Sequence, residues 1–131
     1  MVLVDTSVWI EVFARPSRVD LATLIDLDEI VTTLPVIQEV LQGFRDEHAY
    51  RLARQALFSF PVADSPLPTQ RFEEAAQLFR LTRRAGKSVR SSVDCLIAAT
   101  AIAHRLTVLH RDRDFSALST VSGLQQRDAI G

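Results

Sequence analysis

One stretch, residues 91–103, carries apolar or small side chains on every side of a helix and a single charge, that of Asp94. A helix that is apolar all round is buried within a domain rather than lying at its surface. Ser91 or Ser92 can cap its start, which places Asp94 in the first turn, where the helix dipole favours a negative charge. Two interpretations of Asp94 stay open: a capping residue that reaches solvent, or a metal ligand, because a buried carboxylate needs a cation or hydrogen-bond donors.

Length and composition are those of one globular domain spanning residues 1–131. The chain has 15 basic and 16 acidic side chains, so its net charge neither favours nor excludes a nucleic-acid partner. The single cysteine, Cys95, excludes an internal disulfide and fits a reducing compartment. No apolar run reaches the roughly 18 residues of a membrane-spanning helix, and no secretion signal is seen. We therefore expect a soluble, cytoplasmic protein with no membrane partner.

Short β-branched runs alternate with helical patterns along the chain. Strands are expected at residues 2–4, 30–33 and 107–109, with an edge strand near 60–62 and one short strand in the tail after residue 116. Helices are expected at 8–13, 19–27, 36–42, 47–59, from Pro68 to Arg84, and at 91–103. The helix ending at Arg84 should bury Phe72, Ala75, Ala76 and Phe79. The alternation predicts an α/β fold in three layers, with a central, mostly parallel sheet of four to five strands and helices on both faces.

Acidic residues recur where the expected strands end. Asp5 follows the first strand, Asp112 follows the last clear strand, and Asp94 opens the helix that leads into it. Glu39 lies one turn into the helix after another strand. Taken alone, Asp5 also fits a helix cap and Glu39 a solvated surface residue. Because open α/β sheets build their sites at the carboxyl ends of the strands, we expect all four carboxyl groups to share one cleft.

Four carboxylates in one cleft repel one another and need a cation between them. A set of oxygen ligands suits a hard ion, either Mg²⁺ or Mn²⁺. Zinc is not expected, because the three histidines, His48, His104 and His110, lack the spacing of zinc ligands.

The motifs around these acids occur in a characteristic order along the chain: Asp5-Thr6-Ser7, Pro35 with Glu39 and Gly43, Asp94-Cys95-Leu96-Ile97-Ala98-Ala99, and Arg111-Asp112-Arg113-Asp114-Phe115. In this order and spacing, over essentially the whole chain, they resemble a PIN-domain protein, specifically a VapC-type toxin ribonuclease. The resemblance implies a single PIN domain over residues 1–131. It also implies a Mg²⁺-dependent endoribonuclease that a VapB-type antitoxin holds inactive, and a homodimer.

The resemblance also implies roles for single residues. Asp5, Glu39, Asp94 and Asp112 match the catalytic acids of the family, and Asp5, Asp94 and Asp112 would hold the metal. Ser7 matches a hydroxyl that supports Asp5, Thr6 is the family's usual neighbour, and Asp114 is an additional acidic member. The family often has Thr or Ser two residues before its last aspartate, where this chain has His110.

Two surfaces follow from the same resemblance. A basic run ahead of the Asp94 helix would grip RNA phosphates, although such runs are usually solvated helix ends; its proposed RNA contacts are Arg83, Arg84, Lys87 and Arg90. Trp9 and Phe13 are expected to be exposed apolar edges of an antitoxin-binding groove, since aromatic side chains anchor interfaces.

Asp112 and Asp114 compete for the role of direct ligand. The strand at 107–109 should end near His110, which leaves Asp112 just past the carboxyl edge where Asp5 also emerges. We therefore expect Asp112 to bind the ion directly and Asp114, beside an inward-turned Phe115, to orient it or act through water.

Two other functions remain open. One is phosphoryl transfer with Asp5 as nucleophile, but Lys87 is the only lysine and Ser7 stands where a dehalogenase-type phosphatase has its second aspartate. The other is a catalytically inactive PIN-like module that binds RNA or protein. The presence of all four acids argues against the inactive module, and metal-dependent RNA cleavage separates it from the nuclease.

Overall fold

The computed structural model describes residues 1–130, within which five strands and six α-helices alternate. Two 3-10 turns, Leu21–Thr23 and Leu27–Glu29, lie between α1 and β2. The strands are β1 (Val2–Val4), β2 (Ile30–Thr33), β3 (Val62–Ala63), β4 (Thr107–His110) and β5 (Gln125–Asp128). The helices are α1 (Thr6–Phe13), α2 (Leu34–Gln42), α3 (Glu47–Phe58), α4 (Thr69–Arg84), α5 (Ser92–His104) and α6 (Arg113–Ser119).

The strands form one sheet in the order β3-β2-β1-β4-β5, and every neighbouring pair is parallel. β1 is central, with Val2 in register with Ile30 of β2 and Val4 in register with Leu109 of β4. Beyond that register, the Asp5 amide donates to the Leu109 carbonyl at 2.9 Å. The carboxyl ends of β1 and β4 therefore lie side by side, and the α/β prediction is confirmed.

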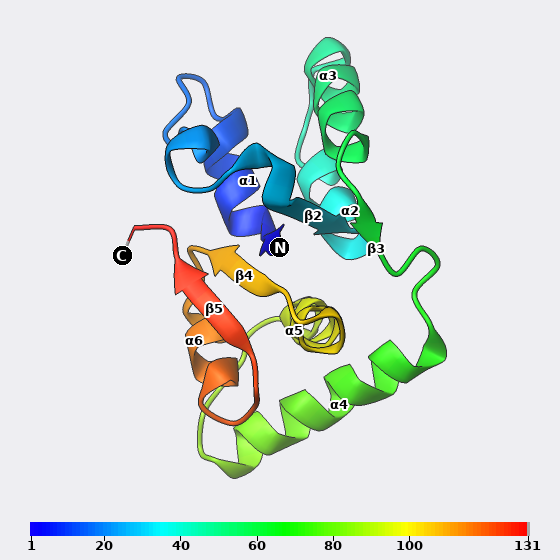
Figure 1. Ribbon diagram of the computed structural model, residues 1–131, viewed down its shortest axis with the longest axis vertical. Coiled ribbons are helices and arrows are strands. Elements are labelled where there is room, and N and C mark those ends of the chain that lie inside the picture. The colour runs from blue at the N-terminus through cyan, green and yellow to red at the C-terminus, as the bar shows by residue number, and fades with distance from the viewer. Residues whose placement is uncertain (131) are drawn as a thin grey trace.

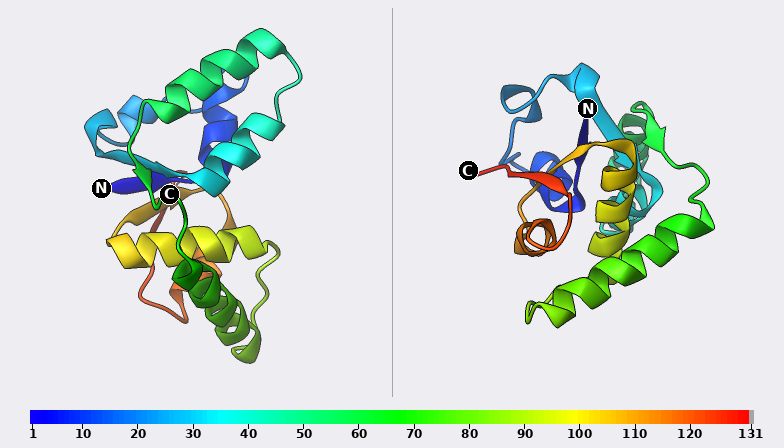
Figure 2. Two further views of the ribbon diagram at one scale, coloured as in Figure 1. Left: turned by 90° about the vertical axis from the view of Figure 1, so that its right-hand side faces the viewer. Right: turned by 60° about the horizontal axis from the view of Figure 1, so that its bottom comes forward.

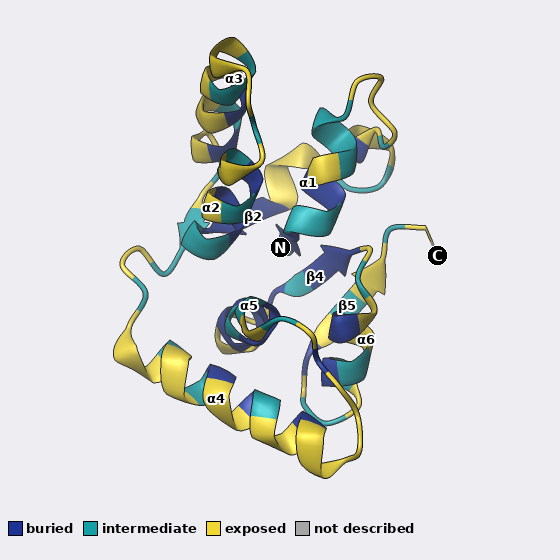
Figure 3. Cartoon of the chain, turned by 180° about the vertical axis from the view of Figure 1, so that it is seen from behind, coloured by how far each residue is buried: buried dark blue, intermediate teal, exposed yellow. Residues whose placement is uncertain are grey.

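Helices cover both faces of the sheet, as Figures 1 and 2 show. α1, α2 and α3 lie on one side, while α5 and α6 lie on the other, with α4 on the outside of α5. Figure 3 shows the consequence for burial: the middle of α5 is largely buried while its last turn is exposed, and much of α4 is exposed. α5 tolerates neighbours on both sides because its buried positions are small or apolar, among them Cys95, Ile97, Ala98 and Ala99.

One predicted helix is absent from the structure. Residues 19–27 form no α-helix, and the segment contains short 3-10 turns instead. The Asp20 and Asp26 carboxylates accept hydrogen bonds from the amides of Ala22 and Asp28, two residues further on. Such local side-chain bonds compete with helical ones, which explains why an apolar pattern here did not produce a helix.

Two predictions of burial are wrong. α4 buries Ala75, Leu78 and Thr82, whereas Phe72 is 53% exposed. The Thr82 hydroxyl donates to the Leu78 carbonyl at 2.7 Å, so a polar residue can occupy this buried stripe at no hydrogen-bonding cost. Trp9 is buried and stacks on Phe13 with 5.6 Å between ring centroids, so Trp9 is not an exposed edge of a groove.

Phe115 is the largest of the fully buried side chains and packs where α6 meets β4. Phe115→Ala should lower the free energy of unfolding by about 3–5 kcal/mol, because it removes a large apolar side chain and leaves a cavity. Urea unfolding monitored by circular dichroism measures this change. Phe72→Ala, on the exposed side of α4, is the matched control and should stay within about 0.5 kcal/mol of the parent; equal losses would contradict the assigned core.

Candidate functional site

Asp5 lies at the junction of β1 and α1, where it caps the helix. Its Oδ2 accepts hydrogen bonds from the Ser7 amide at 3.0 Å and the Ser7 hydroxyl at 2.6 Å. Its Oδ1 is buried and, among residues 1–130, has no hydrogen-bond partner. Burial raises the pKa of this carboxyl above its ordinary value, against the lowering effect of the Ser7 bonds.

Ser7 also joins the two central strands of the site. Its Oγ donates to Asp5 and accepts from the Arg111 amide at 2.9 Å. Arg111 directly follows β4. One hydroxyl therefore links the Asp5 carboxylate to the loop that carries Asp112, and the supporting role of Ser7 stays a prediction.

Glu39 lies on α2, which packs against α1, the helix that Asp5 caps. Its Oε1 accepts a hydrogen bond from the Thr6 hydroxyl at 2.9 Å. Partial burial raises the pKa of Glu39, and the negative charges of Asp5 and Asp112 add to this rise, while the Thr6 bond opposes it. The three carboxyl groups thus share one electrostatic environment, and Thr6 orients the glutamate.

Asp94 lies in the first turn of α5 and is 5% exposed, so the interpretation of a cap that reaches solvent is wrong. Within the described part of the chain, its buried Oδ2 has no hydrogen-bond partner. Burial raises the pKa of Asp94 to about 9, helped by a hydrogen bond with Asp114 and by the charges of Asp5, Asp112 and Asp114. Without a cation, this carboxyl holds a proton at neutral pH.

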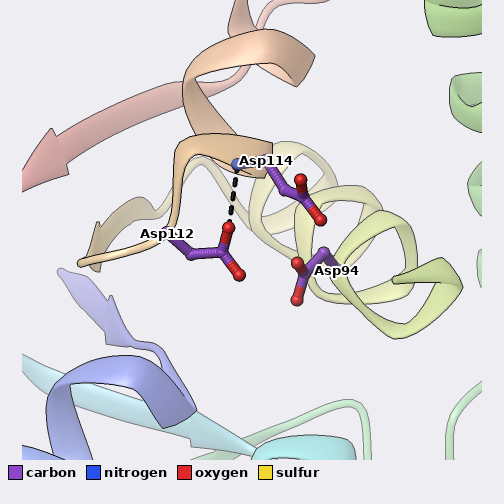
Figure 4. Close-up of side chains that lie close together, drawn as sticks. All are labelled: Asp94, Asp112 and Asp114. Carbon is purple, nitrogen blue, oxygen red and sulfur yellow. Dashed lines mark hydrogen bonds between the residues drawn. The ribbon is translucent and has the colours of Figure 1, made fainter. Parts of the chain in front are cut away.

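Figure 4 shows Asp94, Asp112 and Asp114 with their carboxyl groups gathered between α5 and the start of α6. One oxygen from each lies within 4.8 Å of one oxygen from each of the others. Asp112 caps α6, its Oδ1 accepting from the Asp114 amide at 2.9 Å. Asp114 is 2% exposed, and its Oδ2 accepts from the Arg90 and Ser91 amides at 3.0 and 3.2 Å.

The predicted acids therefore lie around one edge of the sheet, but not all equally close. Asp114, expected as an accessory, belongs to the tightest group, whereas Asp5 lies outside it and acts on Asp94 and Asp112 through its charge. The individual roles of the acids, and the choice of Asp112 over Asp114 as direct ligand, stay predictions.

A cation of the chain itself stands beside the acids. The Arg90 guanidinium lies 3.8 Å from Asp112 Oδ1 through Nη2 and 3.9 Å from Asp114 Oδ1 through Nε. Its side chain is 65% exposed, so these are loose contacts that water screens. Arg83, Arg84 and Lys87 are exposed at the end of α4 and in the following turn, and their role in RNA binding stays a prediction.

Sequence reasoning missed one part of the site. His110 is fully buried at the end of β4, and its Nδ1 accepts from the Asp112 amide at 3.1 Å while Nε2 lies 2.6 Å from Gln126 Oε1. The sequence offered one indication of this role: His110 stands two residues before Asp112, where the family often has Thr or Ser. Gln126 gave no signal, because nothing in the chain order predicts that β5 lies beside β4.

The residues present fit a hard divalent ion. The donors are carboxylate oxygens. Two of them, Asp5 Oδ1 and Asp94 Oδ2, are buried without a partner among the described residues, and burial together with the neighbouring negative charges raises the pKa of Asp94. The histidines lie apart from one another: His104 pairs with Asp64 at 2.8 Å, His110 is engaged by Asp112 and Gln126, and His48 is exposed on α3. The geometry supports an acidic metal site at a strand edge.

Comparison with known proteins agrees with this geometry. The sequence pattern of the PIN domain matches residues 2–120. The chain belongs to the PIN domain family. Ribonuclease VapC11 of Mycobacterium tuberculosis is 34% identical over 130 residues, covering 95% of this chain and 96% of that protein. Ribonuclease VapC51 of the same organism is 32% identical over 122 residues, covering 92% and 87%.

Solved structures share the fold of this PIN domain. A DNA-bound VapBC from Salmonella typhimurium superposes with a TM-score of 0.76 at 17% identity, covering 98% of both chains. VapBC-5 from Mycobacterium tuberculosis, described as a member of a family of toxin-antitoxin systems, gives 0.73 at 23% identity, again with 98% of both chains covered. Among residues 1–130, no helix combines the length and apolarity needed to cross a membrane.

The raised pKa of Asp94 predicts how stability depends on pH. In the unfolded chain this carboxyl titrates near 3.8, and in the folded metal-free chain near 9. The folded state therefore binds the proton more tightly, so the stabilising contribution is complete below about pH 4 and is lost as the pH rises through about 9. The Asp94→Asn side chain cannot ionise, so this variant should lose less stability as the pH rises. At pH 8 it should melt several degrees above the parent, since 1 kcal/mol corresponds to about 3–5 °C in a domain of this size.

Thermal melts in EDTA between pH 5 and 9 measure the effect. Asp28→Asn, which changes an exposed aspartate far from the cluster, is the matched control and should keep the parental slope. Strong destabilisation of Asp94→Asn at pH 8 would instead show that the charge on Asp94 stabilises the metal-free fold.

Proposed function

We propose that this chain is a metal-dependent endoribonuclease, the toxin of a VapBC-type toxin–antitoxin pair. The observation that carries the proposal is the buried acidic cluster at the carboxyl ends of β1 and β4, with two carboxylate oxygens that have no partner in the described chain. The similarity to two VapC ribonucleases supports the same reaction. The proposed substrate is RNA, and the proposed location is the cytoplasm.

We assign Mg²⁺, with Mn²⁺ as the alternative, to Asp5, Asp94 and Asp112, and give Asp114 the role of orienting Asp112. When bound, the ion supplies the positive charge that activates water for attack on a phosphodiester and neutralises the developing negative charge. Ser7 holds Asp5 through two hydrogen bonds, and the Arg90 and Ser91 amides hold Asp114. These bonds keep the acidic oxygens together before substrate arrives, which is preorganisation.

Glu39 is suited to handle the proton of the reaction. Its Oε1 is fixed by Thr6, while its raised pKa makes it a better proton acceptor than an ordinary surface glutamate. In this proposal Glu39 orients the attacking water and takes a proton from it.

RNA binding is assigned to the basic residues that border the acids. Arg90 is mostly exposed and already beside Asp112, so its guanidinium can turn to a phosphate held at the site. Arg83, Arg84 and Lys87 extend this charge along the end of α4. Contacts of this kind position the strand but do not read its sequence.

A VapB-type antitoxin is the proposed partner, and a homodimer the proposed assembly. Structural neighbours of this chain are VapBC complexes, which supports the proposal of a VapB-type partner. An apolar groove of about 250 Å³ beside α1 and α2 suits an apolar segment of that partner; it is lined by Ile10, Phe13, Ala14, Val40, Gly43 and Phe44. We therefore keep Phe13, and not the buried Trp9, in the proposed docking groove. A basic side chain of the partner would enter the acidic cleft.

Cleavage of RNA by the purified chain separates the nuclease from an inactive PIN-like module. We expect endonucleolytic cleavage with Mg²⁺ or Mn²⁺ and none in EDTA. Glu39→Gln should lower the cleavage rate by about 100-fold or more, the usual effect of removing a general base. Glu47→Gln, an exposed glutamate on α3, is the control and should cleave like the parent. RNA binding with no cleavage under any metal condition would favour the inactive module.

Asp112 and Asp114 should respond differently to metal concentration. Asp112→Asn removes a proposed direct ligand and should abolish cleavage at any Mg²⁺ concentration. Asp114→Asn weakens the support of the site, where losses of about 10–100-fold are typical, and should be partly rescued by more metal. A Mg²⁺ titration of the cleavage rate tests both variants; rescue of Asp112→Asn but not Asp114→Asn would reverse the assignment.

A further inference from the structure

His110 is a buried histidine two residues before Asp112, beside the acidic site. It is the last residue of β4, its side chain is fully buried, and its ring packs on Phe115 with 5.2 Å between centroids. Two residues later the chain reaches Asp112. Packing against an aromatic neighbour does not by itself require an imidazole, so the polar partners of the ring carry the argument.

Both nitrogens of the ring are engaged. The Asp112 amide donates to Nδ1 at 3.1 Å, so Nδ1 acts as an acceptor and carries no proton. The ring proton then lies on Nε2 and is donated to Gln126 Oε1 at 2.6 Å. These two partners assign the Nε2–H tautomer to His110. Gln126 lies on β5, in register with Val108 of β4.

These bonds form part of a chain that fixes the loop after β4. The Arg111 amide donates to Ser7, the Asp112 amide to His110, and the Asp114 amide to Asp112 Oδ1. The first bond ties the loop to β1 and the third belongs to α6. Among these three bonds, the one to His110 is the one that leads on to β5, through Gln126, and it uses an acceptor nitrogen that adds no charge competing with a metal ion.

We infer that His110 and Gln126 are a positioning pair for Asp112: Gln126 orients the imidazole, and the imidazole holds the backbone of Asp112 so that its carboxylate faces the ion. The inference rests on the proposed function, in which Asp112 binds the metal. It assigns His110 no contact with substrate and no proton transfer. It explains why a histidine can stand where the family often has a hydroxyl, since a Thr or Ser oxygen can also accept from the amide two residues on.

The test uses the whole chain and measures Mn²⁺ binding by isothermal titration calorimetry. His110→Phe keeps the ring and its packing but removes both bonds, and should weaken Mn²⁺ binding by about 10-fold or more, as loss of ligand-orienting partners does. His110→Thr restores an acceptor for the Asp112 amide and should stay within a few-fold of the parent. His110→Phe binding like the parent, or His110→Thr binding as weakly as His110→Phe, would overturn the inference.

Gln126 gives a second route that leaves the histidine in place, for use if His110→Phe does not fold. Gln126→Met removes the acceptor for Nε2–H and should weaken Mn²⁺ binding by a smaller factor, about 3–10-fold. Gln125→Met is the matched control, because Gln125 precedes it on β5 and is exposed. The control should bind like the parent; equal weakening by both would show a general effect of β5 and overturn the inference.

NMR separates failure of this inference from failure of the proposed function. The ¹⁵N shifts of the His110 ring should report the Nε2–H tautomer, and the Asp112 amide proton should exchange slowly in the parent and faster in His110→Phe. If the parent binds no Mn²⁺ but shows these signals, the metal site is wrong while the positioning of Asp112 stands. An Nδ1–H ring, or an Asp112 amide that exchanges equally in both proteins, overturns the positioning itself.

Discussion

Repulsion among buried carboxyl groups is the constraint on which the rest of this structure depends. Asp5, Asp94 and Asp114 are each at most 5% exposed and lie near Asp112, at a cost that burial and like charge both impose. The chain offsets part of this cost with donors that are themselves fixed. Backbone amides of residues 7, 90, 91 and 114, and the Ser7 hydroxyl, each donate to one of these carboxylates. Two buried oxygens, Asp5 Oδ1 and Asp94 Oδ2, receive no such donor among the described residues, and a divalent ion would compensate them.

Parallel strand order delivers the acids to one place. β1 and β4 are neighbours, so the residues that follow them emerge at the same edge, and both Asp5 and Asp112 cap the helices that begin there. Capping and ligation are therefore not alternatives at these positions. A cap commits one oxygen of each carboxylate to an amide and leaves the other oxygen to face the cleft. The capping bonds at the start of α1 and α6 therefore also orient the Asp5 and Asp112 side chains toward the cleft.

Periodicity and strand ends made most of this fold predictable, because those signals are local in sequence. The buried α5, the parallel sheet and the acids after β1 and β4 all follow from patterns within a few residues. The failures come from competing local bonds and from contacts between distant elements. Asx-type bonds of Asp20 and Asp26 replaced the helix expected at 19–27. The buried stripe of α4 keeps the predicted Ala75 but runs through Leu78 and Thr82, and leaves the predicted Phe72 exposed. The bond between His110 and Gln126 joins residues 16 apart on neighbouring strands, which no periodicity encodes.

Arg90 is a cation of the chain that another cation could replace beside the acids. Its guanidinium is near two of the acids, yet it is 65% exposed and at 3.8–3.9 Å from them, so solvent screens most of the attraction. An arginine held this loosely cannot remove the rise in the pKa of Asp94, which remains near 9 beside it. A cation that enters the cleft more deeply would be attracted to these carboxylates more strongly than Arg90 is, because solvent would screen it less. A divalent ion or a basic side chain of an antitoxin could be that cation. Metal binding and inhibition would then compete for the same unsatisfied charge, and each would release the proton that Asp94 otherwise keeps.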